Sequence, residues 1–169
     1  MCNDAFTVET IIGGFDIPYG IAIVSEDEYF ITDRIGVFYH YKDGTLKEIN
    51  RIPKVPTSKD PGIPTILYGG LMDASIHPNY SINTWIYISY LATDAIPRVS
   101  RFKIKDNTVS QFETIFETST PGYYGNGMRI AWQDDNHFFL NIGGTTLSTN
   151  SNSDLIAQDL NKDWGKYID

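Results

Sequence analysis

The feature that most limits the possible fold is a succession of short β-like runs that recurs along the chain. Four runs of four or five residues, rich in β-branched and aromatic side chains, are separated by charged or glycine-containing turns. They cover residues 20–24, 29–32, 37–41 and 46–49. Asp43-Gly44, between the last two runs, is a strong hairpin signal. Together the four runs predict one antiparallel meander.

The same pattern then returns twice. After a proline-rich connection at 53–64, a second and a third group of runs follow, covering 71–76, 85–90, 99–104 and 112–116, and then 128–132 and 137–142. Ala22 and Phe30 in the first group have the same spacing as Ala131 and Phe139 in the third, each pair crossing an acidic turn. Four-strand units that recur every ~40–50 residues are typical of β-propeller blades. A β-sandwich, whose strands are similarly short, is the alternative.

The length of the chain raises the question of how such a fold closes. At about 45 residues per blade, the 169 residues correspond to three to four blades. An open stack of blades leaves sheet faces unburied. Residues 167–169 also look like the start of a strand. We therefore expect that the chain is a fragment, or that another chain supplies the remaining blades.

Composition argues against several classes of function. A net charge of −8 and a pI near 4.7 disfavour binding to nucleic acid, which requires a basic surface. The single cysteine, Cys2, cannot form an internal disulfide or a cysteine-based metal site. No run approaches the ~18 apolar residues of a membrane span, and no leader peptide is evident. The acidic turns lack the alternating aspartate spacing of a calcium-binding loop, so we expect them to be solvated.

Four segments resemble, in the same order, those of the soluble aldose, glucose and sorbosone dehydrogenases that depend on pyrroloquinoline quinone (PQQ). Residues 17–22 followed by 30–36 are similar to the opening blade of that family, with its Pro-aromatic-Gly strand. Residues 69–80 are similar to its Gly-Gly-Leu-Leu-Asp segment and the His-Pro turn after it, and 85–90 to the next strand. Residues 157–166 resemble its Ala-Gln-Asp-Leu-Asn and Gly-Lys run.

The resemblance identifies residues 11–169 as the N-terminal part of such a domain, with 1–10 as an extension or a first strand. It implies an all-β fold, a partial β-propeller of three to four antiparallel four-stranded blades from a six-bladed family fold. It also implies oxidation of the anomeric carbon of a sugar by hydride transfer to PQQ, with calcium as a second cofactor. Members of the family are typically periplasmic or secreted. Their residues that hold PQQ and calcium lie in later blades.

The chain departs from the family at the position of the catalytic base. There a histidine just before a Gly-Arg-Leu strand takes the proton of the sugar hydroxyl. Here the strand contains Arg129 and Ile130, and Tyr124 or Gly125 stands at the histidine position, depending on where a gap is placed. A phenol titrates near pH 10 and is a poor base at neutral pH without a nearby cation. We therefore assign no catalytic residue.

Candidates for the substrate pocket come from the segments that match the family. They are Tyr68, Tyr124, Asn126 and Arg129. Tyr68 stands where the family often has glutamine, and His77 lies in the His-Pro turn, where we expect it to bond to the backbone. Two hypotheses follow: a sugar dehydrogenase relative that is inactive as this chain, or a non-catalytic propeller that binds carbohydrate or protein. The lack of histidine in 123–129 favours the second.

Overall fold

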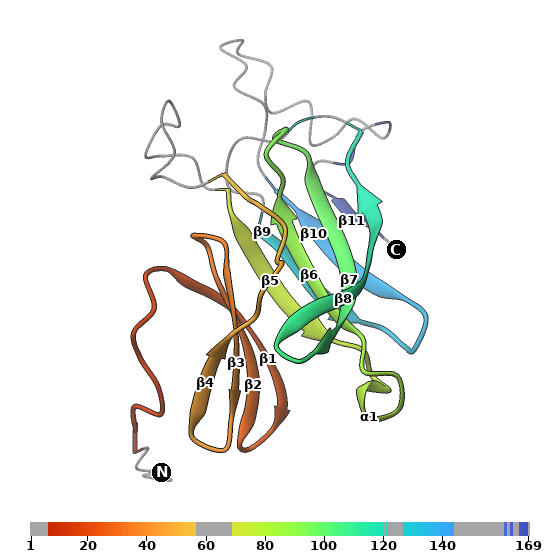
Figure 1. Ribbon diagram of the computed structural model, residues 1–169. Coiled ribbons are helices and arrows are strands. Elements are labelled where there is room, and N and C mark those ends of the chain that lie inside the picture. Colours follow the sequence, from red (N-terminus) through yellow and green to blue (C-terminus); the bar gives the residue numbers. More distant parts are fainter. Residues whose placement is uncertain are drawn as a thin grey trace, which may run out of the picture.

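The computed structural model describes residues 7–56, 69–119, 121, 127–143, 161, 163 and 166–168, which form three antiparallel sheets (Figure 1). The first sheet contains β1 (Pro18–Ser25), β2 (Glu28–Asp33), β3 (Val37–Lys42) and β4 (Thr45–Glu48). The second contains β5 (Leu71–Ile76), β6 (Ile86–Leu91), β7 (Pro97–Lys105) and β8 (Thr108–Glu117), and the one-turn helix α1 (Tyr80–Asn83) connects β5 to β6. The third contains β9 (Gly127–Trp132), β10 (Phe138–Ile142) and β11 (Lys166–Ile168). Within these ranges, no helix is long and apolar enough to cross a membrane.

The three sheets follow one another like the blades of a propeller (Figure 1). Strands that are neighbours in sequence are neighbours in each sheet. The first strands of the sheets, which we call the inner strands, are β1, β5 and β9; β5 contacts both β1 and β9. This arrangement confirms the predicted all-β, partial-propeller fold and differs from a sandwich, which would have two facing sheets. The structure describes two four-stranded blades and a third with three strands.

The predicted repeat is present as matched residue pairs. In each sheet a small residue on the inner strand lies opposite an aromatic residue on the second strand. The pairs are Ala22–Phe30, Ser75–Tyr87 and Ala131–Phe139. The first and third pairs have equal spacing in the sequence because the two sheets have the same strand register. The second sheet has this register too, although the connection between β5 and β6 is longer.

A second repeat, in hydrogen bonds, lies two residues before the small member of each pair. There the pairing of the inner strand with the second strand is irregular, and a side chain of the second strand accepts the backbone N–H. The bonds run from Gly20 N to Thr32 Oγ1 (2.8 Å), from Asp73 N to Ser89 Oγ (3.0 Å) and from Arg129 N to Asn141 Oδ1 (2.6 Å). The backbone N–H at the irregular position of the inner strand is thus bonded to a side chain of the second strand in all three sheets.

Two of these side chains also join each sheet to the next. The Thr32 hydroxyl bonds to the carbonyl of Met72 on β5, and Ser89 Oγ donates to the carbonyl of Met128 on β9 at 2.7 Å. Both hydroxyl-bearing residues are completely buried. Because a buried polar group must find a partner, these bonds fix the position of each sheet along the inner strand of the next sheet.

Two apolar cores fill the spaces between the sheets. Between the first and second sheets, the buried rings of Phe38 and Phe102 pack edge to face with centroids 5.6 Å apart. Between the second and third sheets, Met72, Met128 and Leu140 are almost fully buried. Each core is built from facing strand surfaces, so each sheet depends on its neighbour for burial.

We expect Ser89→Ala to lower the free energy of unfolding by about 2–3 kcal/mol, because it leaves the Asp73 N–H and the Met128 carbonyl buried without this partner. Urea denaturation followed by tryptophan fluorescence measures the loss. Ser25→Ala, at the exposed end of β1, is the control and should change stability by less than about 0.5 kcal/mol. Equal losses in the two variants would contradict a bridging role for Ser89.

Candidate functional site

Arg129 is the predicted pocket residue that the structure describes; Tyr68, Tyr124 and Asn126, with the alternative Gly125, lie outside the described residues. It lies near the start of inner strand β9. The two residues before it, Gly127 and Met128, have φ of +66° and +54°, in the left-handed region that side-chain-bearing residues seldom adopt. This bend buries the Met128 side chain and leaves the backbone of Arg129 exposed to the Asn141 side chain.

The guanidinium of Arg129 connects all three inner strands. Its Nη1 donates to Asp73 Oδ1 on β5 at 2.9 Å, and its Nη2 donates to the carbonyl of Tyr19 on β1 at 2.9 Å. Its central carbon lies 4.3 Å from the centroid of the Tyr19 ring, in cation–π contact. Tyr19, Asp73 and Arg129 lie on the three inner strands, and Asn141 on β10 accepts the Arg129 N–H. We call these four residues the axial cluster.

Asp73 holds the cluster together from below the surface. Only 6% of the residue is exposed. One carboxylate oxygen accepts from Arg129, and the other accepts from the backbone N–H of Ile130 at 2.9 Å. A buried carboxylate is stable only when its charge and lone pairs are matched in this way. Asp73 therefore orients Arg129, and each of its two oxygens is engaged in a hydrogen bond.

Tyr19 and Arg34 bond to the start of β9 and to the residue pair before β5. The Tyr19 hydroxyl donates to the carbonyl of Gly127 at 3.0 Å. A second guanidinium, that of Arg34, lies 5.8 Å from the same ring and donates to the carbonyl of Gly69 through Nε (3.2 Å) and Nη2 (3.1 Å). Gly69 and Gly127 follow Tyr68 and Asn126 in sequence, so the residue after each of these two predicted pocket residues is held by the first sheet or by the turn after β2.

Gly20 allows β1 to approach β5 closely enough for this arrangement. A side-chain carbon at position 20 would lie 2.7 Å from the backbone nitrogen of Ala74 and 2.8 Å from Asp73 Oδ1. Both distances are shorter than non-bonded atoms tolerate. The Pro-Tyr-Gly sequence at 18–20 thus combines the aromatic ring that contacts Arg129 with the absent side chain that makes room for Asp73.

The cluster presents a positive, hydrogen-bonding group to solvent. The Arg129 side chain is 53% exposed, against 8% for Asp73. Of the five N–H groups of a guanidinium, those not bonded to Asp73 or Tyr19 have no partner among the described residues. They can donate to the oxygen atoms of a sugar or of an anion.

The described residues do not by themselves form a site for PQQ or calcium. Calcium takes six to eight oxygen ligands, and among the described residues no group of three or more acidic, histidine or cysteine side chains is placed to hold a metal ion. The buried Asp33 carboxylate already accepts the N–H groups of Asp16, Ile17 and Ile35. PQQ is a tricarboxylate, and the axial cluster offers one exposed guanidinium for such a group.

Three members of the axial cluster were not predicted as site residues. Tyr19 and Asp73 belong to segments that resemble the family, and their positions in those motifs were the available signal. Asn141 lies in a strand of ordinary composition, and the sequence gave no signal for it. Its role follows from the hydrogen bond it accepts from the Arg129 N–H, which only the strand register reveals.

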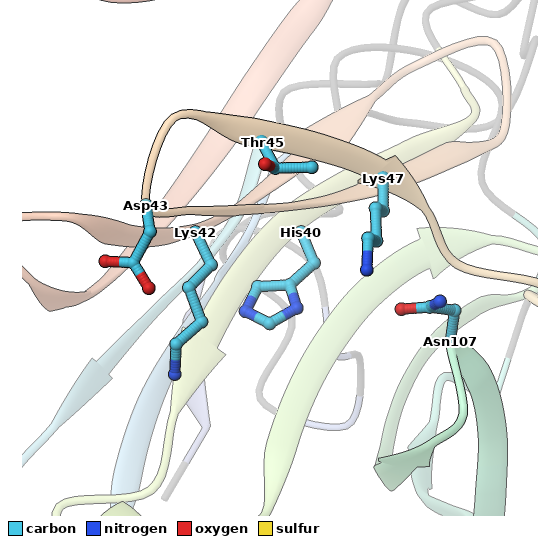
Figure 2. A pocket seen from close by; sticks show the side chains of 6 residues that line it. All are labelled: His40, Lys42, Asp43, Thr45, Lys47 and Asn107. Atoms are coloured by element: carbon cyan, nitrogen blue, oxygen red, sulfur yellow. The ribbon is translucent and has the colours of Figure 1, made fainter.

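A hollow of about 330 Å³ lies away from the axial cluster, between the outer strands of the first two sheets (Figure 2). It is lined by His40, Lys42, Asp43, Thr45, Lys47 and Asn107. Glu28 accepts from His40 Nε2 at 2.7 Å and from Lys42 Nζ at 2.8 Å. The carbonyl of Asn107, on the β7–β8 turn, accepts from the backbone of Asn50, which holds the two sheets together here. These contacts describe a structural ion-pair network at the edge of the fold.

We expect this network to contribute to acid sensitivity. Burial alone would raise the pKa of Glu28, but hydrogen bonds from Lys42 and His40 outweigh it and hold that pKa below its ordinary value of about 4.5. Ionised Glu28 therefore stabilises the fold above the unfolded-state pKa, and this contribution is lost as the pH falls through the lower folded-state value. Glu28→Gln should make the decline in stability between about pH 5 and pH 3 less steep. Urea denaturation across that range tests this, and the control Glu48→Gln, at an exposed position, should retain the wild-type slope.

Comparison with known proteins gives a consistent result. Residues 15–169 match the family model described as Glucose / Sorbosone dehydrogenase. An uncharacterised protein of Synechocystis sp. is 28% identical over 140 residues, which are 79% of this chain and 34% of that protein. The family therefore matches the expectation from the sequence motifs.

Solved structures share the fold at low sequence identity. The soluble aldose sugar dehydrogenase of Escherichia coli, in its apo form, has a TM-score of 0.71 and 22% identity, covering 91% of this chain and 44% of the dehydrogenase. The PQQ-bound aldose sugar dehydrogenase of Streptomyces coelicolor has a TM-score of 0.73 and 21% identity, covering 95% and 46%. The chain thus spans less than half the length of these dehydrogenases and about a third of the Synechocystis protein.

Proposed function

The chain belongs to the glucose/sorbosone dehydrogenase family, and from that premise we propose that residues 11–169 are the N-terminal part of a PQQ-dependent aldose sugar dehydrogenase-like propeller. The reaction of such a protein is oxidation of a sugar at its anomeric carbon, and PQQ when bound supplies the hydride acceptor. The PQQ-bound neighbour supports this cofactor. The share of this chain is to provide the exposed guanidinium of Arg129, fixed by Asp73, as a hydrogen-bond donor to an oxygen-rich ligand.

We propose further that this chain does not oxidise sugars by itself. One observation carries the proposal: the carboxylate of the axial cluster, Asp73, already accepts from Arg129 and Ile130, while the sequence 123–130 contains no histidine. Proton removal from the sugar hydroxyl therefore has no assigned base. Tyr124 stands near the family position, but a phenol holds its proton at neutral pH.

The test is dye reduction by the purified chain with PQQ, calcium chloride and D-glucose or other aldoses. We expect no turnover above the protein-free background. The E. coli aldose sugar dehydrogenase serves as the positive control for cofactor and dye. Tyr124→His and Gly125→His, assayed beside the wild type, ask whether histidine alone restores a rate. PQQ-dependent turnover by the wild-type chain would overturn the proposal.

A non-catalytic propeller that binds carbohydrate or protein is the second candidate. The exposed Arg129 favours it, because a rigid donor without a neighbouring base suits binding better than proton transfer. A glycan array and a pull-down with the intact chain test this function. Hits that are lost in Arg129→Met would support it, and the absence of hits in both assays would count against it.

A further inference from the structure

The second and third sheets enclose a cleft at the opposite end of β9 from Arg129. Arg129 is near the start of that strand and Trp132 is its last residue, which places them about 10 Å apart along the strand. The cleft has a volume of about 300 Å³, enough for one small ring-shaped ligand. We call it the interblade cleft, and the residues considered below line it: His77, Arg101, Trp132, Asp135, Asn136 and Phe138.

The floor of the interblade cleft is aromatic and rigid. The Trp132 ring packs edge to face against Tyr87, with centroids 4.9 Å apart, and against Phe138, with centroids 5.3 Å apart. Its indole N–H donates to Ser75 Oγ at 3.0 Å, which fixes the orientation of the ring. Trp132 and Phe138 are half-buried, so part of their apolar surface faces the cleft. The rings touch one another too closely to admit a cation between them.

The walls of the interblade cleft carry both hydrogen-bond donors and hydrogen-bond acceptors. On one side Arg101 is held by Glu113 at 2.8 Å and stacks over Trp85 at 4.7 Å. On the other side Asp135 uses Oδ2 to accept from Asn79 Nδ2 at 2.6 Å, and its Oδ1 has no partner among the described residues. The exposed side-chain amide of Asn136 adds both a donor and an acceptor.

His77 adds a donor to these walls. Its Nδ1 accepts from the backbone N–H of Asn79 at 3.0 Å, so the neutral ring carries its hydrogen on Nε2. The ring lies 5.1 Å from that of Trp132. The turn hydrogen bonding expected of this histidine is present, and it leaves the second nitrogen available to the cleft.

This combination indicates the chemistry of the ligand. Arg101 is paired with Glu113, and Asp135, which also lines the cleft, accepts from the neutral amide of Asn79. These three charged groups leave a single net negative charge, and no cluster of like charges on the walls points to an ion. A neutral sugar ring has apolar C–H faces that pack on aromatic side chains and hydroxyls that both donate and accept. We propose that the interblade cleft binds one ring of a neutral saccharide, independently of any chemistry at the axial cluster.

Nuclear magnetic resonance tests the proposal on the intact chain. The indole N–H signals of the tryptophans are followed while D-glucose, D-galactose, D-mannose, D-xylose, maltose and cellobiose are added in turn. We expect at least one sugar to shift the Trp132 signal saturably. Asp135→Asn should lower the affinity for that sugar by about tenfold, because the single amide oxygen cannot accept fully from both Asn79 and a sugar hydroxyl. The matched control is Asp27→Asn, in the β1–β2 turn of the first sheet, which should retain wild-type affinity.

Two further arms separate the alternatives. Choline chloride and sodium phosphate are added as ionic probes, and neither should reproduce the shift. Arg129→Met should leave the shift intact, because the axial cluster lies at the other end of the strand. No shift with any sugar, equal affinities in the two aspartate variants, saturation by an ion alone, or loss in Arg129→Met would each overturn the inference. None of these outcomes depends on whether the dye-reduction assay shows turnover.

Discussion

Replacing Gly70 with alanine is expected to prevent the chain from reaching its folded state. Gly70 has a φ of +109°, a conformation that side-chain-bearing residues rarely adopt, and a side-chain carbon there would overlap the carbonyl oxygen of Arg34. Neither the backbone of Gly70 nor that of Arg34 can move away, because both are held by hydrogen bonds. The Gly70 carbonyl accepts from Leu91 N at 3.0 Å, and the backbone of Arg34 donates to the Ile17 carbonyl at 3.0 Å.

The expected cost of Gly70→Ala exceeds about 4 kcal/mol, a large share of the stability of an ordinary domain of about 5–15 kcal/mol. Circular dichroism and urea denaturation measure whether the variant folds. Gly44→Ala is the matched control, because Gly44 also has a positive φ, +78°, but an added carbon meets nothing within 4 Å. It should cost only about 1 kcal/mol of backbone strain. Equal effects in the two variants would show that the contact with Arg34 is not what requires glycine.

The positions of the strands could be predicted because local sequence determines them. Alternation of apolar and polar residues, with turn residues between the runs, placed the described strands of all three sheets. The spacing of Ala22 to Phe30 and of Ala131 to Phe139 predicted a repeat, and the structure confirms it as direct cross-strand pairing. Both signals act between residues that are close in the chain.

The hydrogen-bond repeat could not be predicted in the same way. Thr32, Ser89 and Asn141 occupy equivalent positions and accept equivalent backbone N–H groups. They are three different residue types, which share only an oxygen at a suitable reach from the backbone. A comparison of residue identities between the blades does not detect this. Only the register, with its irregularity on each inner strand, brings the three into correspondence.

The axial cluster could not be predicted from the sequence for a related reason. Arg129 was predicted as a pocket residue from its motif, but nothing local determines where its guanidinium points. Its two partners, Asp73 and Tyr19, lie 56 and 110 residues away in the chain. The packing of three separate sheets brings them together. The sequence therefore identified one member of the cluster and left its orientation open.

We expect Asp73→Asn to lower the free energy of unfolding by about 2–3 kcal/mol and to release the Arg129 side chain. The amide keeps the shape of the carboxylate but has one acceptor oxygen in place of two, so the Ile130 N–H and the guanidinium compete for it. Because Arg129 is 53% exposed, its ion pair contributes modestly, and most of the loss comes from the buried end of the interaction.

A double-mutant cycle with Arg129→Met separates these two contributions. If Asp73 orients the guanidinium, the two substitutions together should cost less than the sum of their separate losses, and the Arg129 Nε–H signal in NMR spectra of the Asp73→Asn chain should broaden or move towards that of a solvated arginine. Additive losses with an unchanged Arg129 signal would show that Tyr19 alone holds the guanidinium. In that case the second sheet would play no part in presenting the one exposed cation of the axial cluster. The proposed function needs that contribution, because a donor must be held rigidly to select a ligand by its oxygen atoms.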